Sequence, residues 1–249
     1  MIALEFDPEI FDKYRPAEND ILNALSKEIS PLSGSIKSLL DVGCGTGSYS
    51  IPLTSKFYLT LTGIDLSGAM LKEACRKLPD GNWINDNFLD WNSTGNFDLI
   101  LMVYVLHLFP NWAMALKKAV DILAPDGALL VVTEDHSALK RSLVHRYMPK
   151  VLEVDLERFP KVGHILRELD LLGLSTKVRN IVTEQELKTS NDVEKLLDAV
   201  RARYISTLQF LEDGELSNGV LKMRLELMSQ LKKGAIRGNR ERSLIVGRH

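Results

Sequence analysis

Residues 39 to 50, LLDVGCGTGSYS, carry the clearest chemical signal in the chain. Glycines at Gly43, Gly45 and Gly47 remove the Cβ atom at every second position, so a ligand can approach the backbone closely. If a helix follows, the N–H groups of its first turn lack partners and face the same space. Asp41 is the last charge before this loop. The pattern therefore predicts a small-molecule site.

The spacing of the glycines bears on which small molecule binds. Dinucleotide enzymes use G-x-G-x-x-G to place a pyrophosphate on the helix N-terminus, but here the third glycine comes one residue early, giving G-x-G-x-G. The Asp41 carboxylate would also repel a pyrophosphate and attract an ammonium group. S-adenosylmethionine carries an ammonium, a sulfonium and an adenosine, and no phosphate. We therefore favour this cofactor over NAD, and an NAD-dependent oxidoreductase is the fallback.

Apolar runs alternate with amphipathic stretches through the first half of the chain. The runs that we expect to form strands are 36–42, 59–65, 82–86, 97–106 and 128–135. Helices are expected at 67–78 and 111–123, and also after the glycines, where Pro52 favours the first turns. This alternation implies right-handed crossovers and an α/β fold with a doubly wound, mostly parallel sheet.

Acidic residues follow several of these strands. Ligands of such sheets bind at the carboxyl ends of the strands, where the strand order reverses. Asp41, Asp65, Asp86 and the segment after Leu101 all fall at such ends. We expect them to face one crevice.

The second half of the chain changes character. Residues 137–172 and 190–233 have helical amphipathic spacing, while 174–182 and 243–249 read as a sixth and a seventh strand. We therefore expect a single domain over 1–249, with a cofactor-binding core at about 36–135. The two helical stretches are the expected lid, and a last strand at about 243–247 completes a seven-stranded sheet.

Composition excludes several function classes. The 249 residues carry a net charge of −2 with a pI near 6.2, so no overall basic field attracts nucleic acid or an anionic membrane. Cys44 and Cys75 are the two cysteines, and their spacing indicates neither a disulfide framework nor a metal site. No apolar signal core or 18-residue apolar run occurs. We expect a cytoplasmic protein that is a monomer or a homodimer.

Several motifs together resemble those of the class I, Rossmann-like S-adenosylmethionine-dependent methyltransferases. LLDVGCGTGSYS resembles their first motif, LTGIDLSGAMLKEA the second, the segment from IND to LDW the third, and FDLILMVYVLHLFPNWAMALKKAVDILAPDGALLVV the fourth to sixth. The matches cover about residues 38 to 134 in the right order. FDKYRP at 11–16 is similar to the N-terminal segment of the small-molecule group.

The resemblance implies roles for individual residues. Asp41 and the Gly43 carbonyl would meet the methionyl ammonium, Asp65 would accept both ribose hydroxyls, and Asp86 would accept the adenine amino group. Asp86 is also an ordinary turn residue, and Met70 could equally be part of the core. The full set expected at the cofactor is Arg15, Asp41, Gly43, Cys44, Gly45, Gly47, Asp65, Leu66, Met70, Asp86, Asn87, Phe88 and Val103.

The sequence defines the binding site of the methyl acceptor less clearly than that of the cofactor. Methyl transfer is an in-line displacement at an activated carbon, so orientation and exclusion of water matter more than a fixed catalytic set. The chain lacks the motifs of the enzymes that methylate exocyclic amines of bases, C5 of cytosine or arginine side chains of proteins. His107 and Tyr14 are the candidate catalytic residues, although His107 could equally be structural. His136, His145 and His164 lack metal-ligand spacing, and we expect them to be solvated or capped.

Two other functions stay open at this point. One is methylation of RNA, with tRNA as an example, and the other is a non-catalytic regulator that binds S-adenosylmethionine. The one basic run, 232–242, could meet a phosphate, but its glycines favour a solvated hairpin. The main prediction is an enzyme that methylates a small molecule.

Overall fold

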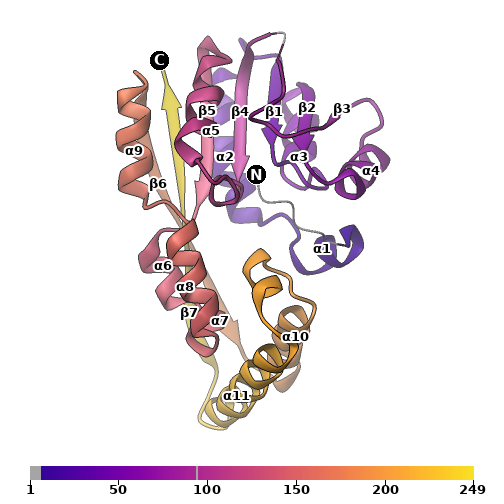
Figure 1. The fold of residues 1–249 in the computed structure, drawn as a ribbon, viewed down its shortest axis with the longest axis vertical. Coiled ribbons are helices and arrows are strands. Elements are labelled where there is room, and N and C mark those ends of the chain that lie inside the picture. Colours follow the sequence, from indigo (N-terminus) through magenta and orange to yellow (C-terminus); the bar gives the residue numbers. More distant parts are fainter. Residues whose placement is uncertain (1–6, 94) are drawn as a thin grey trace. The chain divides into compact units, whose positions relative to one another are not determined.

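A computed structural model describes residues 7–93 and 95–249 of the chain (Figure 1). The first six residues, on which the expectation of no signal core partly rests, lie outside this range. The chain forms two compact units, which are described separately. Unit 1 comprises the residues up to Glu134 together with Pro160–Ile181 and Arg242–His249, and unit 2 comprises Asp135–Phe159 and Val182–Glu241.

The sheet has seven strands in the order β3-β2-β1-β4-β5-β7-β6 and belongs to unit 1, except that β6 beyond Ile181 and β7 before Arg242 fall in unit 2. The strands are β1 (Ser38–Val42), β2 (Thr60–Asp65), β3 (Asn82–Asn85), β4 (Phe97–Val103), β5 (Leu123–Thr133), β6 (Ser175–Leu187) and β7 (Ile236–Arg248). The first five pair in parallel, and β7 runs antiparallel to β5. The predicted α/β fold with a mostly parallel, doubly wound sheet is confirmed.

Helices cover both faces of this sheet. They are α1 (Pro8–Tyr14), α2 (Asn19–Ile29), η1 (Ser30–Leu32), α3 (Ser50–Phe57), α4 (Gly68–Lys77), η2 (Leu106–Leu108), α5 (Trp112–Asp121) and α9 (Val162–Leu171). Side chains of α5 and α9 join one buried cluster, and those of α2 and α3 join the other. The two clusters take alternate residues of each central strand, as the period of two requires.

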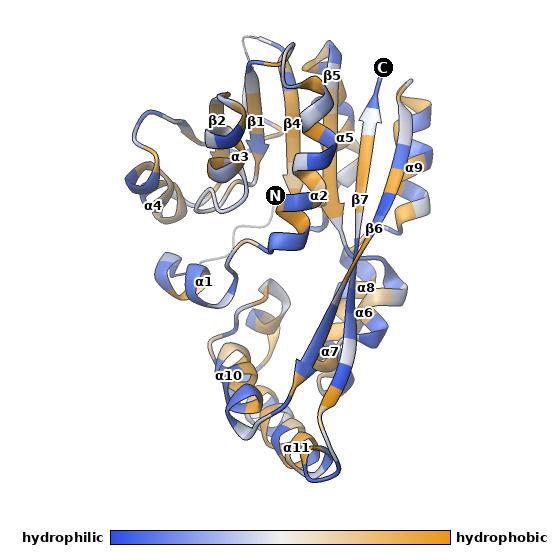
Figure 2. Cartoon of the chain, turned by 180° about the vertical axis from the view of Figure 1, so that it is seen from behind, coloured by the Kyte–Doolittle hydropathy of each residue, from blue (hydrophilic) through white to orange (hydrophobic). Residues whose placement is uncertain are grey.

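The central strands are apolar on both sides, which explains their place in the sheet. In β4, Leu99 and Leu101 face one cluster while Ile100 and Met102 face the other, and all four are fully buried. Figure 2 shows β4 and β5 as the hydrophobic strands of this sheet. Burial on both faces is what the continuous apolar run predicted.

Three boundaries differ from the sequence prediction. β4 ends at Val103 rather than 106, because Tyr104 takes a left-handed φ of 53° and the chain then enters η2. β5 begins at Leu123, and the APDG segment forms an irregularity in its pairing with β4 rather than a separate turn. α3 runs past Pro52, because a proline in the first helical turn removes only an N–H that has no helical partner.

Unit 2 is mainly helical. Its helices are α6 (His136–Arg141), α7 (Leu143–Tyr147), α8 (Pro149–Arg158), α10 (Ser190–Arg201), η3 (Ser206–Phe210) and α11 (Asp213–Leu231). Their apolar faces form a separate core that includes Val151, Leu197 and Met223. The capping box at Thr189 fixes the start of α10. The expected lid therefore divides: α9 packs against α5 in unit 1, and the other helices of both ranges belong to unit 2.

The structure corrects two predictions about polar residues in part. His145 is not in solvent: it is 5% exposed, and its Nε2 lies 2.8 Å from the buried Asp155. Most of the basic run 232–242 is exposed, as expected, but it is no hairpin loop, since β7 begins at Ile236, and its last residue, Arg242, is buried with its guanidinium 2.8 Å from Glu18. The described residues contain no helix long and apolar enough to span a membrane and no acidic, cysteine and histidine cluster that could hold a metal ion.

Candidate functional site

The carboxyl ends of four neighbouring parallel strands lie at one edge of the sheet in unit 1. Asp41 is opposite Gly63 in the pairing of β1 with β2, and Asp65 is opposite Asn85 in the pairing of β2 with β3. Asp86 directly follows β3. The strand order therefore brings the predicted acidic strand ends to the same edge, as the sequence indicated.

The glycine loop after β1 has a backbone that other residues rarely adopt. Gly43, Gly45 and Gly47 have φ angles of 67°, 53° and 73°. The N–H groups of Gly43 and Cys44 donate to the Ile64 carbonyl at 2.8 and 3.2 Å, which fixes the loop to β2. A Cβ on Gly45 would meet no heavy atom closer than 4.0 Å, so the loop backbone is open there.

Asp65 links the end of β2 to this loop. Its two carboxylate oxygens accept the N–H groups of Gly45 at 2.8 Å and of Ser67 at 2.9 Å. Burial raises the pKa of Asp65, and these backbone donors offset part of the rise. Each oxygen keeps a second lone pair for a further donor. The helix cap itself is Ser67, whose hydroxyl accepts the Met70 N–H.

Asp41 is a buried acid, with 3% of its surface exposed. Burial raises its pKa to about 7, the Ser50 hydroxyl offsets this in part, and the neighbouring Asp65 carboxylate adds to it. Burial also raises the pKa of the Cys44 thiol, and both carboxylates raise it further. Cys44 thus stays a protonated filler of the loop, and Asp41 and Asp65 form a pair of neighbouring acidic groups in a largely buried place.

The turn after β3 carries the three residues expected at the adenine. Asp86 is exposed and accepts the Asn87 N–H at 2.7 Å, while Phe88 is fully buried. Lys118 of α5 was not anticipated. Its ammonium donates to the Leu89 carbonyl at 3.0 Å and to that of Trp91, and it lies 5.3 Å from the Phe88 ring centroid. A single cation thereby fixes this turn to α5.

The remaining predicted cofactor residues lie on neighbouring elements of unit 1. Leu66 is half-buried in the turn after β2, whereas Met70 is 4% exposed within α4, as a core residue would be. Val103 is the half-buried last residue of β4.

Beyond β4, a chain of polar contacts crosses the sheet. The Tyr104 hydroxyl donates to Glu18 at 3.0 Å, and the second carboxylate oxygen of Glu18 pairs with buried Arg242. The Arg15 guanidinium lies 5.8 Å from the Tyr104 ring centroid and 5.1 Å from that of Phe11. Arg15 is therefore beside Tyr104, the residue that follows β4, and its expected contact with the cofactor stays a prediction.

The two candidate catalytic residues lie on either side of this region in the sequence. His107 is 8% exposed in η2. Tyr14 is the last residue of α1 and is half-buried, with the Lys13 ammonium 4.9 Å from its ring centroid. Their catalytic roles stay predictions.

A polar cluster that the sequence did not reveal attaches α1 to the glycine loop. Asp12 accepts a hydrogen bond from the Thr46 hydroxyl at 2.6 Å and pairs with Lys77 of α4. Lys77 also donates to the Thr46 carbonyl at 3.3 Å. Because these residues are 31 to 65 positions apart, no local pattern marks them.

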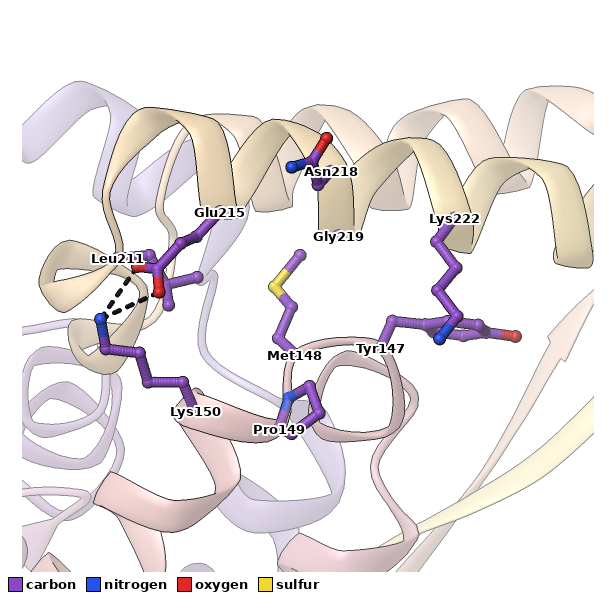
Figure 3. Close-up of a pocket in the computed structure, with 9 residues that line it drawn as sticks. All are labelled: Tyr147, Met148, Pro149, Lys150, Leu211, Glu215, Asn218, Gly219 and Lys222. Atoms are coloured by element: carbon purple, nitrogen blue, oxygen red, sulfur yellow. Dashed lines mark hydrogen bonds and ion pairs between the residues drawn. The ribbon is translucent and has the colours of Figure 1, made fainter.

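Unit 2 contains a cavity of about 250 Å³ between α11 and the α7–α8 junction (Figure 3). Met148 points toward Gly219, and Lys150 bonds both oxygens of Glu215 at one end. The lining is largely apolar, and this ion pair already occupies two of its charged groups. The lining residues are Tyr147, Met148, Pro149, Lys150, Leu211, Glu215, Asn218, Gly219 and Lys222.

Comparison with known proteins agrees with this geometry. The methyltransferase-domain family matches residues 11–188, which include the glycine loop and β1 to β6. The sheet order is that of the class I S-adenosylmethionine-dependent methyltransferases, and the chain belongs to this family of methyltransferase domains.

Curated relatives match over a shorter stretch. Trans-aconitate 2-methyltransferase of Escherichia coli O1:K1 is 32% identical over 102 residues, which is 41% of this chain and 40% of that protein. The enzyme of the same name from Rhodopseudomonas palustris is 29% identical over 101 residues, 40% of each. The match thus spans well under half the length of these relatives.

Solved structures share the fold over nearly the whole chain. A structure of a methyltransferase from an antibiotic biosynthesis pathway of Anabaena variabilis has a TM-score of 0.72 at 19% identity, covering 93% of this chain and 98% of that one. A phosphoethanolamine N-methyltransferase of Haemonchus contortus, bound to phosphomonomethylethanolamine and S-adenosylhomocysteine, has a TM-score of 0.60 at 16% identity, covering 96% and 56%. At these identities the likeness establishes the fold.

Proposed function

We propose that the protein transfers a methyl group from S-adenosylmethionine to a small-molecule acceptor. The observation that carries this proposal is the buried Asp41 carboxylate beside a glycine loop whose backbone is open at Gly45. A buried acid without a cation is costly, and the cofactor's ammonium group would supply that cation. When bound, the cofactor provides a methyl group on a sulfonium, which is already activated for displacement.

The chain's own residues fit the other parts of the cofactor. The free lone pairs of Asp65 can accept the two ribose hydroxyls while its bonds to Gly45 and Ser67 hold the loop. The backbone of Asn87 and Phe88 would border the adenine, in a turn that Lys118 fixes. Lys118 thus acts as a positioning residue for the adenine.

The displacement of the methyl group needs a general base only if the acceptor must lose a proton. The protein must hold the acceptor in line with the methyl group and exclude water. His107 would remove a proton where the acceptor loses one, and Tyr14 would orient the acceptor.

A small acceptor fits better than RNA. The acidic pI gives no basic face for a phosphate backbone, and Arg242 of the one basic run is buried in an ion pair. The relatives named for trans-aconitate make a polycarboxylate a reasonable first acceptor to assay.

The purified protein is expected to bind S-adenosylmethionine and S-adenosylhomocysteine, and not NAD. Calorimetry measures binding, and release of S-adenosylhomocysteine in the presence of a metabolite pool measures transfer. NAD binding without heat from either sulfur compound would contradict the proposal. Cofactor binding without any transfer would favour a regulator over an enzyme.

The raised pKa of Asp41 predicts a pH dependence of stability. Below about pH 4 both the folded and the unfolded chain hold this proton, so the group adds no pH dependence to stability there. Between about pH 4 and 7 only the unfolded chain ionises, so stability falls as pH rises, by about 4 kcal/mol in all. Ligand-free Asp41→Asn should therefore be more stable than wild type at about pH 8, with no difference near pH 4.

Cofactor binding should favour the ionised form of Asp41 instead of the protonated form. The cofactor's ammonium favours ionised Asp41, so binding near pH 6 should release a proton, and Asp41→Asn should bind more weakly. Calorimetry in buffers of different ionisation enthalpy measures how many protons are released on cofactor binding. Chemical unfolding measures the free energy of unfolding of wild type and of Asp41→Asn. A variant that is less stable than wild type at pH 8 would show that Asp41 is satisfied within the chain.

A further inference from the structure

Trp83, the second residue of β3, lies against three glycines of unit 1. Gly63 is its partner in the pairing of β2 with β3, and a Cβ on Gly63 would lie 2.4 Å from the indole Cζ3 atom. A Cβ on Gly81 would lie 2.8 Å from three atoms of the same ring, and one on Gly47 would lie 3.2 Å from Cη2. The indole is therefore packed directly against the backbone at three separate places.

The ring, and not the backbone conformation, accounts for two of these glycines. Gly47 has a left-handed φ of 73°, but Gly63 and Gly81 have no positive φ. A glycine inside a strand, such as Gly63 in β2, often marks a place where another group approaches the backbone closely. At Gly63 and Gly81 that group is the indole, since a Cβ at either position would force the ring to move.

The indole extends from the sheet to the glycine loop. Gly47 is the last glycine of that loop, where its N–H donates to the Cys44 carbonyl at 2.9 Å and its carbonyl accepts the Ile51 N–H at 3.0 Å. These bonds lie within the loop and α3, whereas the indole comes from β3. Trp83 and Ile51 pack against the same buried cluster, and the indole Nε1–H donates to the Leu78 carbonyl at 3.0 Å. The ring thus has a fixed orientation in which it attaches this half of the loop to the sheet.

We propose that Trp83 is a positioning residue for the cofactor, because it supports the glycine loop at Gly47 in the conformation that binds S-adenosylmethionine. This inference rests on the proposed methyl transfer. Glycine loses more conformational freedom on ordering than any other residue, so an unsupported loop would adopt the binding conformation only part of the time. The apparent affinity for the cofactor falls in proportion to that fraction. Trp83 acts through the loop and needs no contact with the cofactor.

Calorimetry with S-adenosylhomocysteine on the full chain tests the inference, and melting temperatures are measured on the same proteins. Trp83→Ala should weaken binding roughly tenfold, which corresponds to a loop that is ordered a tenth of the time. Trp83→Phe keeps a ring beside Gly63 but is shorter toward Gly47, so its affinity should lie between those of wild type and Trp83→Ala. Trp112→Phe is the matched control and should bind as wild type does, because Trp112 packs against the cluster on the other face of the sheet.

Gly63→Ala separates support of the loop from general stability. Its Cβ would displace the indole, so this variant should also weaken cofactor binding, although Gly63 is not one of the residues expected at the cofactor. In Trp83→Ala the ring is absent, and the added Cβ meets chiefly the Cys44 sulfur at 2.9 Å. Gly63→Ala should therefore reduce the affinity of Trp83→Ala much less than that of wild type, which is a coupling between the two sites.

Three results would overturn the inference while the proposed function stands. Wild-type affinity in Trp83→Ala and Trp83→Phe, with a lower melting temperature, would leave the ring a structural role only. An equal loss of affinity in Trp112→Phe would show that the effect does not depend on the loop. Additive losses in Gly63→Ala and Trp83→Ala would show that the ring does not transmit the clash. If Trp83→Ala does not fold, the two Phe variants decide. A wild type that does not bind S-adenosylhomocysteine would instead reject the proposed function, and this inference with it.

Discussion

Asp65→Ala is expected to weaken S-adenosylhomocysteine binding by roughly tenfold to a hundredfold. The carboxylate would lose its bonds to the ribose hydroxyls, and hydrogen bonds to a charged group contribute roughly 1.5–3 kcal/mol. The substitution should also lower the free energy of unfolding by about 1–3 kcal/mol, because Gly45 N–H and Ser67 N–H lose their acceptor. From the sequence we would expect folding to be unaffected, and these two bonds correct that expectation.

Two matched variants separate the roles of this carboxylate. Asp65→Asn keeps the size and one acceptor, so its affinity should lie between wild type and Ala. Ser67→Ala removes the actual helix cap and should cost about 1 kcal/mol of stability with cofactor affinity intact. Melting temperature and calorimetry on the same proteins provide both readouts. Wild-type affinity in Asp65→Ala would remove Asp65 from the cofactor site.

Gly43→Ala is expected to be strongly destabilising. The backbone φ of 67° costs an alanine about 1–2 kcal/mol. Its Cβ would also lie 2.9 Å from Val105 Cβ and nearer still to one of its methyl groups, in a buried core that has no room. Overpacking of this kind costs about 1–3 kcal/mol, so the sum is roughly 2–5 kcal/mol. Chemical unfolding measures it.

Gly45→Ala is the matched control for that experiment. Its φ of 53° carries the same backbone strain, but no heavy atom lies within 4.0 Å of the new Cβ. It should therefore lose only the strain energy while still obstructing the cofactor. Adding Val105→Ala to Gly43→Ala should make the double variant more stable than the two single losses predict. Additive losses, or equal losses at Gly43 and Gly45, would rule out the clash.

Most of the sheet could be predicted from the sequence, because strands are marked by patterns of neighbouring residues. β1, β4 and most of β5 are apolar runs, and the position of Asp41 and Asp65 at strand ends follows from the strand boundaries alone. The end of β4 was missed because the left-handed Tyr104 is held by a hydrogen bond to Glu18, 86 residues away in the chain. Neither composition nor periodicity can reveal a contact between residues so far apart in the chain.

The parts of the site that depend on tertiary pairing were not predictable. Asp12 and Lys118 are ordinary charged residues of amphipathic helices, and only the fold shows that they fix the glycine loop and the turn after β3. His145 was expected to be solvated or capped, and its pairing with Asp155 was missed for the same reason, since Asp155 lies on another helix. The functional roles of His107 and Tyr14 stay predictions.

The place of β7 in the sheet has a consequence for synthesis. Residues Ser243–Gly247 pair with β5 and lie between β5 and β6, so the interior of the sheet contains a strand that is translated after both of its neighbours. Until they arrive, Leu129 to Thr133 present an apolar edge with unpaired backbone groups, which is a template for association with another chain. Nascent chains are thus exposed to aggregation until translation of this strand is complete.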